Sequence, residues 1–217
     1  MIQPMIFPTK VPVRRLLCLG AHADDLEIGC GGTVLRLLEA VPGIEVHWHV
    51  FSAAGPRRRE ARASARHFLT EARRPRIAVH SFRESYFPQA WAAIKNEFER
   101  IKRRLEPDLV LTHAREDRHQ DHRVLSDLAW NTFRQSFLLE YEIPKYDGDL
   151  GQPNYYVALD EGIARRKIAA ILKYFPSQAH RHWFTEDTFR ALLRLRGIEG
   201  GPQTRLAEAF YARKMVV

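Results

Sequence analysis

The sequence predicts an α/β protein with a Rossmann-like, doubly wound and mainly parallel sheet that carries helices on both faces. Short, continuous apolar runs, typical of strands that are covered on both sides, alternate with amphipathic helical patterns. In addition, polar clusters rich in His and Asp follow two of these runs directly, at residues 21–25 and 113–122. Because ligands bind beyond the carboxyl ends of the strands in such sheets, both clusters are expected at the same edge.

The first half of the chain supplies three of the predicted strands. Residues 16–19 form the first, and a helix is expected from Gly29 onward, after a glycine-rich turn. Alternating polarity at residues 44–50 predicts the second strand, and residues 77–79 the third. Between them, apolar positions within residues 61–69 mark the inward face of an arginine-rich helix.

The second half begins with the clearest amphipathic helix, whose apolar residues step by three and four between Trp91 and Leu105. A strand follows Pro107 and ends near Thr112, and the next helix is expected to begin close to His119. Further predicted elements are an irregular loop at residues 144–156, helices at 163–175 and 189–195, and a final strand at 207–213. The loop is either a substrate wall or lid, or a merely structural excursion.

Length and composition favour one domain over residues 1–217, to which residues 144–217 contribute the loop, helices and last strand. The chain has 217 residues, of which 45% are hydrophobic, enough for a sizeable core. The two cysteines, Cys18 and Cys30, lie in or beside apolar elements, which argues against a disulfide framework. Since no apolar stretch of about 18 residues is present, we expect no transmembrane segment and a cytoplasmic protein, which could be a homo-oligomer.

The net charge of +8 has two interpretations. Much of the excess lies in arginines between residues 57 and 76, which form either a solvated helix face or a surface that attracts an acidic partner, such as a phosphorylated substrate or a membrane surface. No basic motif interleaved with aromatic residues and no zinc-finger spacing is present, so we expect no nucleic-acid partner.

The two polar clusters predict a metal site. His22 and Asp25 are close enough in a turn to bind one ion together, and His122 is the best candidate for a third ligand. Two histidines and one carboxylate leave a tetrahedral Zn²⁺ ion with an open position, which is the catalytic arrangement. We therefore expect one Zn²⁺ per chain, although Fe²⁺, Co²⁺ or Mn²⁺ also suit these ligands.

The remaining residues of the clusters suit acid–base roles. Asp24 is adjacent to a ligand and free to act as a general base, and His119 can donate a hydrogen bond or proton to an oxyanion or leaving amine. Asp121 is expected to orient the imidazole of His119. Together these residues predict metal-assisted hydrolysis of an amide or ester. The alternative is a nucleotide or sugar-phosphate binding protein without hydrolase activity, in which the Gly-rich turn and the arginine helix hold phosphate.

The motifs Ala-His-Ala-Asp-Asp (21–25) and His-Gln-Asp-His (119–122) resemble those of the LmbE-like, or PIG-L, family of zinc-dependent N-deacetylases. The resemblance implies an LmbE-like fold, zinc ligation by His22, Asp25 and His122, a general base at Asp24, and oxyanion stabilisation by His119 with Asp121. It also implies that either Arg57 or Arg59 contacts the substrate. Ala23 stands where the family usually has Pro, and Leu26 where an acidic residue is common.

The resemblance extends to the substrate. Residues 141–148 are similar to the subset of the family found with bacterial glycan and sugar-modification pathways. This similarity implies a small-molecule substrate, an N-acetylated amino sugar such as N-acetylglucosamine or a glycoconjugate, from which the acetyl group is removed. The pathway would be bacterial glycan or natural-product biosynthesis.

Overall fold

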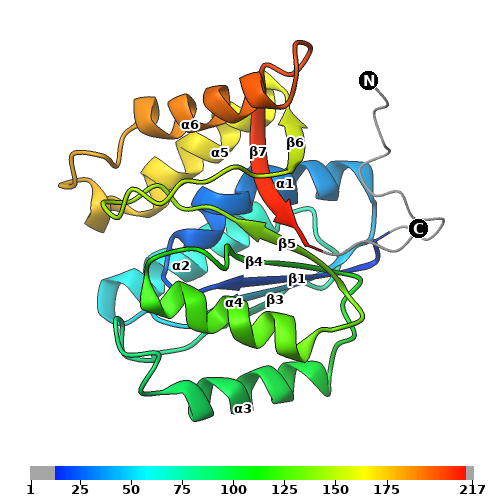
Figure 1. Cartoon of the computed structure of the whole chain (residues 1–217), viewed down its shortest axis with the longest axis vertical. Coiled ribbons are helices and arrows are strands. Elements are labelled where there is room, and N and C mark those ends of the chain that lie inside the picture. The colour runs from blue at the N-terminus through cyan, green and yellow to red at the C-terminus, as the bar shows by residue number, and fades with distance from the viewer. Residues whose placement is uncertain (1–12, 214–217) are drawn as a thin grey trace.

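A computed structural model describes residues 13–213, which form one seven-stranded sheet between two layers of helices (Figure 1). The strands are β1 (Arg15–Gly20), β2 (Glu45–Val50), β3 (Arg76–Val79), β4 (Leu109–His113), β5 (Phe137–Tyr141), β6 (Tyr155–Leu159) and β7 (Leu206–Ala212). Their order is β3-β2-β1-β4-β5-β7-β6; β1 to β5 run parallel, and β7 is antiparallel to both of its neighbours. The mainly parallel α/β sheet confirms the predicted fold class.

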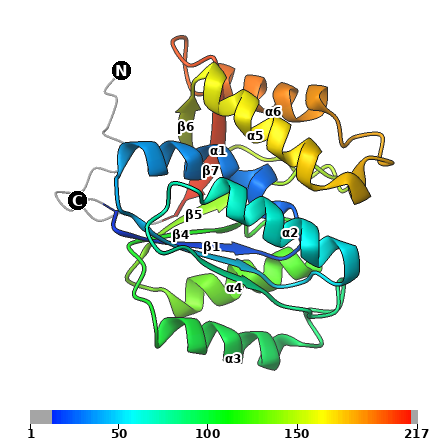
Figure 2. The same cartoon turned by 180° about the vertical axis from the view of Figure 1, so that it is seen from behind.

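The helices cover both faces of the sheet (Figures 1 and 2). They are α1 (Asp25–Ala40), α2 (Gly55–Phe68), α3 (Trp91–Lys102), α4 (Gln120–Thr132), α5 (Glu161–Tyr174), α6 (Glu186–Glu199) and the 3-10 turn η1 (Pro176–Gln178). Helices α3 and α4 share one core with Leu17 and Leu19, whereas the other four α-helices share the opposite core with Leu16 and Cys18. Within residues 13–213, no helix is both long enough and apolar enough to cross a membrane.

Two strands were not predicted from the sequence. In β5 the apolar run is interrupted by Glu140, whose buried carboxylate accepts a hydrogen bond from Arg213 Nε at 3.0 Å. Among residues 13–213, β6 is an edge strand that pairs only with β7, and its first two residues lie in the segment predicted as a loop. The strands predicted at residues 16–19, 44–50, 77–79, 109–112 and 207–213 are present as β1, β2, β3, β4 and β7.

The glycines after the first polar cluster lie inside helix α1, so the prediction of a glycine-rich turn was wrong. α1 already begins at Asp25, and Gly29 and Gly31 form part of its buried face. A Cβ atom on Gly29 would lie 2.2 Å from Cδ2 of Tyr141, and one on Gly31 would lie 2.7 Å from Cε1 of Phe68. The glycines therefore allow close packing of α1 against β5 and α2 rather than a change of chain direction.

A buried ion pair fastens α1 to the C-terminal part of the chain. Lys167 Nζ lies 2.6 Å from Glu208 Oε1 and donates to the carbonyl of Ile28 at 2.7 Å. The two carboxylate oxygens of Glu208 accept hydrogen bonds from the backbone N–H groups of Gly32 and Thr33, at 2.7 and 2.6 Å. In a regular α-helix the groups of Ile28 and Gly32 bond to each other, so side chains of α5 and β7 contact the backbone of α1 at this turn.

Candidate metal centre

The sheet topology places both polar clusters at one crevice. β1 and β4 are neighbouring parallel strands, and the chain leaves them toward opposite faces of the sheet, into α1 and α4. The strand order reverses between them, which is the point where ligands bind in doubly wound sheets. His22 and Asp25 follow β1, while His119 caps the N-terminus of α4 and His122 lies in its first turn. The helix predicted to begin close to His119 is thus confirmed.

Three donor atoms meet in the crevice, and we call them the donor triangle. His22 Nδ1 lies 3.1 Å from His122 Nε2 and 3.3 Å from Asp25 Oδ2, and the last two atoms are 3.5 Å apart. A tetrahedral zinc ion with bonds of about 2.0–2.1 Å separates its ligand atoms by about 3.3–3.4 Å. The two imidazoles and the carboxylate therefore fit one face of a zinc coordination sphere.

Each histidine of the triangle is held by a carboxylate on its other ring nitrogen. His22 Nε2 lies 3.2 Å from Asp121 Oδ2, and His122 Nδ1 lies 2.9 Å from Asp117 Oδ2. Metal-binding histidines are commonly oriented in this way. Asp121 was expected to orient His119; its carboxylate faces His22 instead, and it is the backbone N–H of Asp121 that contacts His119 Nδ1.

Backbone contacts settle the tautomer of His119. Its Nδ1 accepts a hydrogen bond from the backbone N–H of Asp121 at 3.2 Å, so a neutral ring carries its proton on Nε2. Burial, followed by the neighbouring His22, lowers the pKa of His119 below its ordinary value. His119 is therefore a neutral hydrogen-bond donor beside the donor triangle.

Two further histidines lie near enough to offer alternative donor sets. Nitrogen atoms of His22, His119 and His122 lie within 4.8 Å of one another, and so do donor atoms of Asp25, His113 and His122. His113 Nε2, however, already lies 3.0 Å from the backbone nitrogen of Ala21, which donates to it. In the donor triangle all three separations, 3.1, 3.3 and 3.5 Å, lie near those of a tetrahedral ion.

Asp24 lies beside the triangle without belonging to it and pairs with Arg57. Arg57 Nη2 donates to Asp24 Oδ1 at 2.6 Å. Burial raises the pKa of Asp24, and the guanidinium of Arg57 opposes that rise. Arg59, the other candidate for substrate contact, is exposed on α2, and among residues 13–213 it makes no hydrogen bond or ion pair with the site. The structure thus brings Arg57, but not Arg59, to the crevice.

The electrostatics of the triangle favour a cation. Burial lowers the pKa of His22, but the carboxylates of Asp25 and Asp121 outweigh it and raise the value to about 10. Burial lowers the pKa of His122 to about 3, which leaves a neutral ring with a lone pair on Nε2. The pKa of Asp25 is lowered despite its burial, because three histidines surround its carboxylate.

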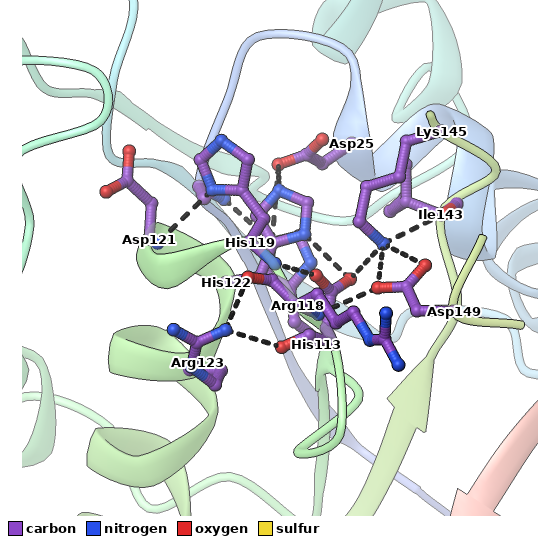
Figure 3. A network of polar contacts seen from close by, with 12 residues as sticks. Asp25, His113, Arg118, His119, Asp121, His122, Arg123, Ile143, Lys145 and Asp149 are labelled. Carbon is purple, nitrogen blue, oxygen red and sulfur yellow. Dashed lines mark hydrogen bonds and ion pairs between the residues drawn. The ribbon is translucent and has the colours of Figure 1, made fainter. Parts of the chain in front are cut away.

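Sequence reasoning missed several residues that support the site (Figure 3). Asp117 lies inside the run from His113 to His122, and its place before the histidines was an available signal. Lys145, which lies 2.9 Å from Asp117 Oδ2, is a single lysine in a loop and gave no signal. The backbone N–H groups of Ser85 and Phe87 bind the carboxylate of Asp121, at 2.6 and 3.0 Å, and no side-chain pattern encodes such contacts.

Known proteins share this fold. Across 91% of the chain, the structure is similar to an N,N'-diacetylchitobiose deacetylase from Pyrococcus horikoshii, with 83% of that chain covered, 23% identity and a TM-score of 0.69. The pseudoaglycone deacetylase Dbv21 has 20% identity, coverages of 92% and 96%, and a TM-score of 0.71. GalB, a 4-carboxy-2-hydroxymuconate hydratase from Pseudomonas putida, has 16% identity, coverages of 94% and 98%, and a TM-score of 0.75.

At these identities the likeness to solved structures is one of fold. The sequence itself matches the model of a family described as PIG-L: GlcNAc-PI de-N-acetylase over residues 17–133, more than half of its length. That segment contains both polar clusters and all three atoms of the donor triangle. The chain therefore belongs to the PIG-L family of de-N-acetylases.

Proposed function

We propose that the protein is a metal-dependent N-deacetylase, active as one domain, that removes the acetyl group of an N-acetylated amino sugar or glycoconjugate. The observation that carries the proposal is the donor triangle with a separate carboxylate, Asp24, and a neutral donor, His119, beside it. Family membership supports the same reaction. Because the fold is also that of a hydratase, the site rather than the fold has to carry the argument.

We assign His22, Asp25 and His122 as the residues that hold one Zn²⁺ ion. When bound, such an ion supplies Lewis-acid polarisation of an amide carbonyl and lowers the pKa of water to about 7. Asp121 and Asp117 keep the two imidazoles turned so that one nitrogen of each faces the ion.

Asp24 is the proposed general base. Its carboxylate is buried beside the triangle without belonging to it, so it is available to take a proton from the attacking water. Arg57 holds the carboxylate in one orientation through the 2.6 Å contact to Oδ1. We assign Arg57 to this orienting role, with substrate contact as a further role open to its partly exposed side chain.

His119 is the proposed donor to the developing oxyanion. The proton on Nε2 is fixed there by the backbone bond to Nδ1, so the ring presents a donor without a change of tautomer. Donors aimed at a developing negative charge lower the barrier by about 3–4 kcal/mol in known hydrolases. The amide is cleaved to acetate and an amine, and the proton collected by Asp24 is available to that amine.

The substrate class follows from the related proteins. Two of the similar structures are named as deacetylases of N,N'-diacetylchitobiose and of a pseudoaglycone, both acetylated compounds. A role in bacterial glycan or natural-product biosynthesis fits these names. The alternative of a phosphate-binding protein loses its main support, because the glycines needed for a phosphate loop lie in α1 under the side chains of Tyr141 and Phe68.

The test combines metal analysis with an activity panel. Purified protein reconstituted with zinc is expected to hold about one ion per chain and to release acetate from N-acetylglucosamine, N,N'-diacetylchitobiose or their glycosides. His122→Ala is expected to lose both the ion and the activity. Absence of acetate from every compound in the panel, with metal-loaded protein, would overturn the deacetylase proposal.

A further inference from the structure

The loop between β5 and β6, residues 142–154, contacts the candidate metal centre through Lys145 (Figure 3). The side chain of Lys145 is only 12% exposed. Its Nζ donates to Asp117 Oδ2 at 2.9 Å, to Asp149 at 2.6 Å and to the carbonyl of Ile143 at 3.4 Å. All three protons of the ammonium group are therefore used within the site and its loop.

Asp117 connects this lysine to the donor triangle. The oxygen that accepts from Lys145 also accepts from His122 Nδ1 at 2.9 Å, and the other oxygen accepts from the backbone N–H of His119 at 2.8 Å. The carboxylate is buried, so it has little water to replace a lost partner. One carboxylate thus orients the ring of His122, binds the backbone of His119 and is itself held by the loop.

Asp149 closes a second connection between the loop and the centre. Besides its contact with Lys145, its Oδ2 accepts from the backbone N–H of Arg118 at 2.7 Å. The loop is therefore bound twice to the segment that leads into α4. The positive charge of Lys145 lies between the carboxylates of Asp117 and Asp149, which would otherwise repel each other.

We propose that Lys145 is a positioning residue that couples the order of loop 142–154 to metal binding through Asp117 and His122. The inference rests on the proposed metal centre. It adds a route by which metal binding changes the order of loop 142–154. Without the ammonium group, Asp117 loses the partner that fixes its Oδ2 toward His122. Because coupling is reciprocal, a metal bound to His122 orders the loop, and an ordered loop raises the affinity of the site for the metal.

The first measurement is zinc affinity, by competition with a chromophoric chelator, in Lys145→Met and Lys145→Arg. Lys145→Met is expected to weaken zinc binding by roughly tenfold, as for other residues that orient a ligand, and Lys145→Arg to restore most of the loss through its charge. Lys95→Met is the matched control, because it removes a Lys–Glu ion pair on α3 that belongs to no part of the site. Its zinc affinity is expected to equal that of the wild type.

The second measurement is cleavage of the loop by chymotrypsin, with and without zinc. Tyr146 and Leu150 are 68% and 42% exposed, so both are accessible to the protease. Zinc is expected to slow cleavage in the wild type and in Lys95→Met, and to protect Lys145→Met much less. If Lys145→Met does not fold, judged by circular dichroism, Lys145→Gln replaces it, since it keeps a donor and removes the charge.

Unchanged zinc affinity and unchanged protection in the folded uncharged variant would overturn the coupling and leave the metal centre intact. A loss in Lys145→Arg as large as in Lys145→Met would also overturn it, because the charge would then not be the cause. Failure of the wild type to bind zinc at all would overturn the proposed metal centre and this inference with it.

Discussion

Two neighbouring carboxylates face different partners, and the reason is local. Asp24 is the N-cap of α1 and Asp25 is its first helical residue, so their side chains leave the chain in different directions. Asp25 accepts from the backbone N–H of His22 at 2.7 Å and faces the histidines. Asp24 pairs with Arg57, and this separation supports the proposed roles of Asp25 as a metal ligand and Asp24 as the general base.

Replacing Asp24 by Asn tests that separation. Asp24→Asn is expected to lower kcat by about 10²–10⁴-fold, because an amide cannot accept the proton, while zinc content stays at the wild-type level. Acetate release and elemental analysis on the same preparation measure both. Loss of zinc from this variant would instead place Asp24 among the metal ligands.

Site residues that follow a strand closely could be predicted from the sequence, because the end of the strand fixes their position. His22, Asp25 and His122 come directly after or close to two apolar strands, so their meeting followed from the expected topology. The partner of Asp121 was not predictable in the same way. Whether its carboxylate turns to His22 or to His119 depends on the backbone of residues 85–87, which supplies two further donors to it.

At the scale of elements, packing explains what sequence patterns could not. Helix α1 lies so close to β5 that Gly29 contacts the ring of Tyr141, whose hydroxyl donates to the carbonyl of Leu19 at 2.8 Å. A pattern of glycines is typical of turns, but here it permits tight packing of a helix. Strand β6 was not predicted because its residues alternate irregularly between buried and exposed positions. It is recognisable as a strand through its pairing with β7.

Gly29→Ala is expected to lower the free energy of unfolding by about 1–3 kcal/mol, because the new methyl group displaces the ring of Tyr141. Chemical denaturation of both proteins measures the difference. Gly162→Ala in α5 is the control, since its Cβ meets only the side chain of Asp160 at 3.1 Å; its effect is expected to stay under about 1 kcal/mol. Equal effects of the two substitutions would contradict the packing argument.

At the scale of the whole molecule, the proposed ion joins parts of the chain that are far apart in sequence. His22 and Asp25 lie on the β1 side of the crevice and His122 on the β4 side, so one ion bridges two βα units on opposite faces of the sheet. Binding energy at this point therefore stabilises the arrangement of both layers. Folding stability and metal occupancy should be linked.

Zinc is accordingly expected to raise the melting temperature. A free zinc concentration 100 times the Kd adds about 2.7 kcal/mol, which corresponds to roughly 5–10 °C for a chain of this size. Calorimetry with added zinc and with a chelator measures the shift, and His122→Ala should show none. An equal shift in that variant would mean that zinc stabilises the protein from another position.

The buried pair of Lys167 and Glu208 bears on how far this protein can be shortened. The family match ends at residue 133, and every proposed zinc ligand lies before that point. A fragment trimmed to the match would nevertheless leave α1 without the two charges that contact its backbone. Residues of the C-terminal part thus support the helix that carries a proposed metal ligand near the N-terminus. A shortened version of the protein would need other side chains that make these contacts with α1.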